Sequence, residues 1–174
     1  MLRRIVLVSL AAILVAPATA LGQTRRRTQS RPRPAPTSTQ RVSPVRTAGA
    51  TKVADQIKLM TRFCYLLGGV ANGIAAVDEA VRRNEASPQV VAKNQQDKVL
   101  VKTSIQGFRE GLDKLEIEFR NTPELQPYYI KLAGSAAGAA KAEELAGANQ
   151  FDPAGRTLLT VINRLTDVLV IMRQ

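Results

Sequence analysis

The 174-residue sequence contains no histidine and no tryptophan, and it has one cysteine, Cys64. Without histidine, the chain lacks the general base of Ser-His-Asp and Cys-His pairs, and it lacks imidazole ligands for metal ions. A lone cysteine also excludes an intramolecular disulfide. The commonest catalytic and metal-binding arrangements are therefore missing, so we expect no enzyme activity, no cofactor and no metal site.

Acidic residues are few, and they do not converge on one point. Glu110, Asp113 and Glu116 alternate with basic residues in one stretch, which is typical of a charged outer helix face with pairs such as Glu110 to Lys114. The inward-facing carboxylate pairs of a di-metal helical bundle are not indicated.

The formal charge of +11 is unevenly distributed. Residues 1–50 hold nine arginines and no acidic residue, whereas residues 51–174 hold 16 basic and 14 acidic residues. The basic character therefore belongs to the N-terminal part, and we expect no specific binding to nucleic acid.

Residues 1–20 have the pattern of a secretory signal peptide. Arg3 and Arg4 precede an apolar run over 5–16, and Ala18 to Ala20 supply small residues at the cleavage position. An uncleaved membrane anchor is the alternative, but the apolar run is shorter than the ~20 residues that a bilayer requires. We expect cleavage near Ala20, no transmembrane segment in the mature chain, and a periplasmic or extracellular location.

Residues 21–50 are rich in Arg, Pro, Ser and Thr, which predicts a disordered linker. Two interpretations are open for its positive charge. It is either a spacer, or a tether that contacts anionic envelope polymers or lipid headgroups in a salt-dependent way. The candidate contact residues for the second interpretation are Arg25, Arg26, Arg27, Arg31 and Arg33.

Residues 51–174 have apolar residues at helical spacing throughout. They predict an all-α domain, an up-down-up-down antiparallel four-helix bundle that follows the signal peptide and the basic tail. The expected helices cover about 52–84, 88–120, 123–148 and 153–173. Their starts are marked by Ser87-Pro88, Thr122-Pro123 and Asp152-Pro153, which are typical of N-terminal capping.

The first two helices each carry an apolar seam that steps by three and four residues. If they fold as an antiparallel hairpin, Val53 faces Phe119, and every facing pair along the lower seam is apolar. Near the turn the seam becomes polar, and Asp78 is expected to face Asn94.

The last two helices pair large side chains with small ones. Ile162 is expected against Ala139 or Ala140, and Leu165 against Ala136 or Ala137. Such pairs allow two helix backbones to approach closely.

Because the first two helices are longer than the last two, their turn is expected to project beyond the rest by about nine residues, or roughly 13 Å. This projecting tip has mixed charge, and it is either a partner-binding surface or simply a solvated helix end. The candidate contact residues are Asp78, Glu79, Arg82, Arg83, Lys93, Asn94 and Lys98.

Cys64 and a set of glycines each have a structural and a functional interpretation. Cys64 lies on the seam, which favours a buried apolar role over a nucleophilic one. Glycines at 68, 69 and 73, facing those at 134 and 138, would either permit close helix crossing or leave space between the first and third helices for an apolar ligand.

These observations favour an exported, non-enzymatic helical bundle that serves as a structural or protein-interaction module of the cell envelope. Its partner is a protein, or an anionic polymer or lipid headgroup contacted through the tail. The alternative is a four-helix bundle that binds a small apolar molecule.

Overall fold

The computed structural model describes residues 43–174, and every regular element in that range is an α-helix. The helices are α1 (Pro44–Arg82), α2 (Pro88–Asn121), α3 (Gln126–Leu132), α4 (Ser135–Gly147) and α5 (Phe151–Met172). The predicted all-α class is therefore confirmed. The signal peptide and most of the basic tail lie outside the described residues.

Helix α1 begins earlier than predicted. We expected a linker up to residue 50, but residues 44–50 are helical. The Ser43 side chain accepts a hydrogen bond from the backbone N–H of Val45 (3.2 Å), and Pro44 occupies the first turn, where its missing N–H costs nothing. Gly49 is buried against Leu125, so this added segment belongs to the core.

The predicted helix over 123–148 is wrong, because the chain breaks between α3 and α4. Gly134 adopts a left-handed conformation with φ of 87°, which glycine tolerates without strain. Two contacts from other helices hold the break. Arg164 donates to the Ala133 carbonyl (3.1 Å), and the Glu116 carboxylate accepts from the Ala136 N–H (2.8 Å), which caps α4 from outside.

Helix α5 also starts before the predicted capping residue. Its first residue is Phe151, so Asp152 and Pro153 lie within the first turn and Gln150 is the N-cap. Asp152 forms an ion pair with Arg156 (2.7 Å) one turn later. An acidic residue in the first turn still favours the helix through its dipole.

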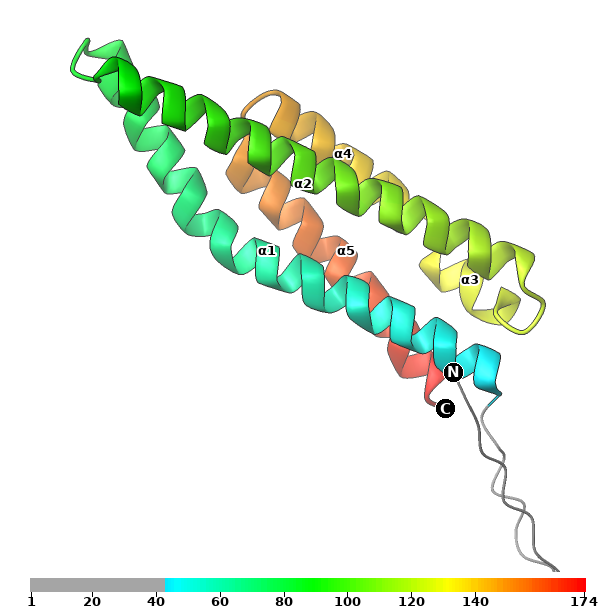
Figure 1. Ribbon diagram of the computed structural model, residues 1–174. Helices are drawn as coiled ribbons and strands as arrows, with labels where there is room; N and C mark the ends of the chain where they lie inside the picture. The colour runs from blue at the N-terminus through cyan, green and yellow to red at the C-terminus, as the bar shows by residue number, and fades with distance from the viewer. Residues whose placement is uncertain (1–42) are drawn as a thin grey trace, which may run out of the picture. The chain divides into compact units, whose positions relative to one another are not determined.

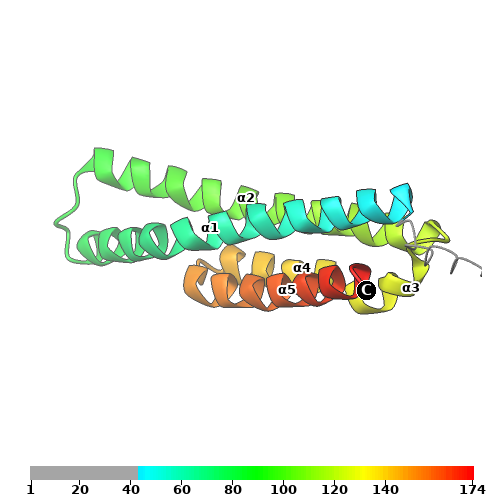
Figure 2. The same ribbon diagram turned by 90° about the horizontal axis from the view of Figure 1, so that it is seen from below.

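Helices α1, α2, α4 and α5 surround the core, and the short α3 packs on α2 and α5 (Figure 1). Helix α1 packs against α2 and α5, and α4 packs against α2 and α5. In Figure 2, α1 and α2 form one layer and α4 and α5 form the second. Helix α4 contributes buried alanines, and the largest fully buried apolar side chains come from α1, α2, α3, α5 and the link before α3: Phe119, Met60, Ile105, Leu112, Leu125, Leu132, Leu158 and Leu165.

The facing of α1 and α2 agrees with the predicted hairpin. Near the turn, Asn94 donates to the Asp78 carboxylate (2.7 Å), as expected. At the far end, Lys52 pairs with Glu118 (2.6 Å), and Val53 and Phe119 are both fully buried.

Small residues of α4 meet larger ones of α5. A Cβ atom added to Gly138 would lie 2.7 Å from Cγ2 of Val161, too close for any real contact. The buried alanines of α4 and the buried Ile162 and Leu165 of α5 are part of the same core. The α4–α5 interface therefore depends on small side chains, as expected.

Candidate functional site

The turn between α1 and α2 projects beyond the α4–α5 connection (Figures 1 and 2). The seven predicted tip residues do not form one group there. Asp78, Asn94 and Lys98 come together between the helices, while Glu79, Arg82 and Arg83 pair with one another or with Glu85.

The three inward residues form a compact polar cluster. One oxygen of Asp78 accepts hydrogen bonds from Asn94 Nδ2 and Lys98 Nζ, both at 2.7 Å. The Lys98 side chain is only 11% exposed, and Asp78 is its ion-pair partner. The cluster satisfies its own polar groups, which makes it a device that fixes the register of the hairpin.

The outward tip residues are exposed and locally paired. Glu79 contacts Arg82 and Arg83 on α1, and Lys93 forms an ion pair with Asp97 one turn later on α2. Exposed pairs of this kind contribute little stability.

A groove between α1 and α2 is the feature that sequence reasoning missed. Two adjoining hollows of about 560 and 200 Å³ share Val70 and Asp97, and every residue that lines them belongs to α1 or α2. We call this surface the outer groove; the lining residues used below are Phe63, Leu66, Val70, Gly73, Val77, Val90, Lys93, Asp97, Leu100 and Ser104.

The outer groove is strongly apolar for an exposed surface. Leu66 is 55% exposed and Leu100 is 62% exposed, although both are large aliphatic residues. Within the described range, no residue of α3, α4 or α5 lines it. A sequence signal was present, since residues 63, 66, 70, 73 and 77 form a second seam, but we assigned only one seam to each helix.

The glycines of α1 do not have the role that we predicted. A Cβ atom added at Gly68, Gly69 or Gly73 would meet no atom within 4 Å in the described part of the chain. They therefore neither support a close helix crossing nor face the glycines of the α3–α4 region. Gly134 and Gly138 instead contact Arg164 and Val161 of α5, because α1 packs on α5 and α2.

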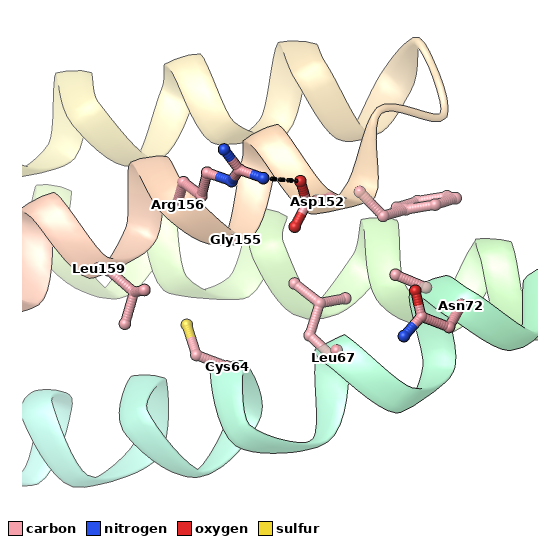
Figure 3. A pocket seen from close by; sticks show the side chains of 10 residues that line it. Cys64, Leu67, Asn72, Asp152, Gly155, Arg156 and Leu159 are labelled. Atoms are coloured by element: carbon pink, nitrogen blue, oxygen red, sulfur yellow. Dashed lines mark hydrogen bonds and ion pairs between the residues drawn. The ribbon is translucent and has the colours of Figure 1, made fainter. Parts of the chain in front are cut away.

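A smaller hollow lies between α1 and α5 (Figure 3). It measures about 180 Å³ and is lined by Cys64, Leu67 and Leu159, with the Asp152–Arg156 ion pair at its edge. Cys64 is half-buried, and burial raises the pKa of its thiol. A raised pKa lowers the thiolate fraction, so the site gives no activated nucleophile.

One cross-helix ion pair has a clear electrostatic effect. The Glu143 carboxylate, 2.6 Å from Arg109 Nε, raises the pKa of the guanidinium, and Asp113 adds to this effect. The pair joins α2 to α4 and thus has a structural role. The predicted Glu110 to Lys114 ion pair is not formed among the described residues, and Glu110 instead accepts a hydrogen bond from Gln106.

Among residues 43–174, no group of three or more acidic or cysteine side chains is placed to hold a metal ion. By length and composition α1 could cross a membrane, and only 17% of its most apolar window is buried. The tail arginines at 25, 26, 27, 31 and 33 lie outside the described residues.

Comparison with protein-family models, curated proteins and solved structures finds no match.

Proposed function

We propose that the chain is an exported, non-enzymatic protein of the cell envelope whose up-down-up-down antiparallel four-helix bundle presents the α1–α2 hairpin to a protein partner. The observation that carries this proposal is the outer groove. Leu66 and Leu100 expose most of their aliphatic surface on a projecting element, and exposed apolar patches on soluble domains mark interaction sites.

The polar cluster of the tip supports the same proposal. Asp78 and Lys98 join the two helices directly through an ion pair. A surface built on two fixed helices is presented in one geometry, which reduces the entropy lost when a partner binds.

The basic tail has a separate place in this proposal. The signal-like residues 1–20 direct export, and Arg25, Arg26, Arg27, Arg31 and Arg33 contact anionic polymers or lipid headgroups near the domain. Such contacts release counterions, so they weaken steeply as salt rises.

The proposal is tested by photo-crosslinking in the organism that makes the protein. A photoreactive residue at Leu100 is expected to give a defined protein adduct, and one at Ile117 is not. Ile117 is the matched control because it is 50% exposed on the same helix and does not line the groove. N-terminal sequencing of the exported protein should find a start near Leu21. A cytoplasmic, uncleaved chain with no Leu100 adduct would contradict the proposal.

The hollow between α1 and α5 favours the second candidate function, binding of a small apolar molecule. At about 180 Å³ it slightly exceeds the roughly 150 Å³ of a cavity that holds benzene, but it is smaller than most ligand pockets. Xenon or benzene titration monitored by NMR tests this candidate, with Leu67→Trp as the variant expected to abolish binding.

A further inference from the structure

We infer that the outer groove binds the outer groove of a second copy, so that two hairpins pack antiparallel across a two-fold axis near Gln95. The inference rests on the proposed function, because it names the partner of the same surface. A two-fold interface requires a surface that is complementary to itself.

The α2 side of the groove has this self-complementarity. Val90, Lys93, Asp97 and Leu100 line it in that order, spaced symmetrically about Gln95. When two α2 helices lie antiparallel about that point, Lys93 of each copy faces Asp97 of the other. The same register places Val90 opposite Leu100 at both ends, so apolar side chains also meet apolar side chains.

The α1 side fits the same axis. The hydrogen bond between Asp78 and Asn94 fixes how the two helices align, and it puts Val77 level with Gln95. The axis therefore brings the two Val77 side chains together and places Gly73 near Val81 of the second copy. Gly73 has open space around it in the described chain, which leaves room for that close approach.

The length of the overlap suits a specific interface. In this register Pro88 lies opposite Lys102 of the second copy, so α2 residues 88–102 pair with the second copy, which is roughly 22 Å of helix at 1.5 Å per residue. Two such helices in each copy have to bury about 800 Å² per copy for the contact to have the size of a standard specific interface.

Two other occupants fit the groove less well. A lipid surface does not match it, because Lys93 and Asp97 place an ion pair in the middle of the apolar stripe. Residues 21–42 do not match it either, because their only aliphatic side chains are those of Leu21, Ala35 and Val42.

Charge reversal tests the register directly. Residue 93 of one copy faces residue 97 of the other. In the Lys93→Asp variant both of these positions are acidic, and in the Asp97→Lys variant both are basic, so each variant alone should remain monomeric. A mixture of the two should form a heterodimer, since acidic positions then face basic ones. Sedimentation velocity on the purified full protein, from about 1 to about 100 µM, measures all three.

We expect the unchanged protein to dimerise in this range, each single variant to dimerise at least ~10-fold more weakly, and the mixture to recover most of the loss. Leu100→Glu should also abolish dimerisation, and Ile117→Glu should leave it intact. Circular dichroism confirms that each variant is folded. A monomeric unchanged protein, or a mixture that fails to associate, would overturn the inference.

The outcome also separates the inference from the proposed function. A monomeric protein whose Leu100 crosslinks to a different envelope protein rejects the dimer but keeps the interaction module. A Leu100 position that crosslinks to nothing, in a monomeric protein, rejects both. Retention on lipid vesicles that requires Leu100, without dimerisation, also rejects the dimer.

Discussion

The two ends of the α1–α2 hairpin are built differently. At the base, α4 and α5 cover the inner face, and Val53, Met60, Leu112 and Phe119 are buried. At the tip the hairpin extends past α4 and α5 (Figure 2), and where it leaves them its inner seam is the hydrogen-bonded cluster around Asp78, beside the α4–α5 connection.

This difference separates stability from recognition. The base removes apolar side chains from water, which stabilises the fold. The tip holds its helices by polar contacts, and the outer groove that runs from the tip toward the base leaves aliphatic residues such as Leu66 and Leu100 exposed. Variants at the base should therefore affect unfolding, and variants in the outer groove should affect association.

The largest effect is expected at the base. Leu165→Ala leaves a cavity beside the α4 alanines and should lower the free energy of unfolding by about 2 to 5 kcal/mol in urea. Leu159→Ala is the control on the same helix, since Leu159 is 48% exposed and should lose little. Equal losses for both variants would show that α5 does not face the core as described.

The next effect is expected in the polar cluster. Asp78→Ala leaves Lys98 largely buried without its carboxylate and should destabilise the protein by about 1 to 2 kcal/mol, since Asp78 itself is partly exposed. Adding Lys98→Met to Asp78→Ala should restore most of the loss, because no buried charge then remains unpaired. A double variant that is less stable than Asp78→Ala would contradict the role assigned to this cluster.

Two glycine substitutions should have opposite signs. Gly138→Ala forces a methyl group against Val161 and should destabilise the protein by about 1 to 3 kcal/mol. Gly69→Ala meets open space and should stabilise α1 by up to about 1 kcal/mol through helix propensity. Thermal unfolding of both variants at low protein concentration measures the contrast, and a destabilising Gly69→Ala would mean that something covers that surface.

The smallest effect is expected at Cys64. Because burial raises the pKa of its thiol, the thiolate fraction at a given pH is below that of a free cysteine. Reaction with a thiol reagent should be slow at neutral pH and should accelerate with rising pH through and beyond the usual thiol pKa. The unfolded chain in urea is the control and should react faster at each pH. Equal rates in both states would contradict the burial of Cys64.

Much of the helical pairing could be predicted from the sequence. The seams of α1 and α2 repeat at regular spacing, and the hairpin geometry then determined that Asp78 meets Asn94. Local capping signals such as Ser87 also predicted the start of α2 correctly, since the Ser87 side chain accepts from the Val90 N–H.

The remaining features depend on contacts between distant residues. The break at Gly134 is held by Arg164 and Glu116 from other helices, whereas the alanine-rich sequence alone favours a continuous helix. The early start of α1 has a local signal as well, since Ser43 and Pro44 cap it as Ser87 and Pro88 cap α2, and Leu125 packs over Gly49 from a distant part of the chain. The outer groove was not predicted because we assigned each helix a single apolar seam, the one that faces the core, whereas the groove is lined by a second seam.

Amide hydrogen exchange of the intact protein at low and high concentration tests the contrast between base and tip most directly. We predict slow exchange at the base at both concentrations. In the tip, around Val77 and Gln95, exchange should be fast when dilute and should slow markedly when concentrated, as a second copy covers the outer groove. Equal protection of base and tip, unchanged by concentration, would contradict the account.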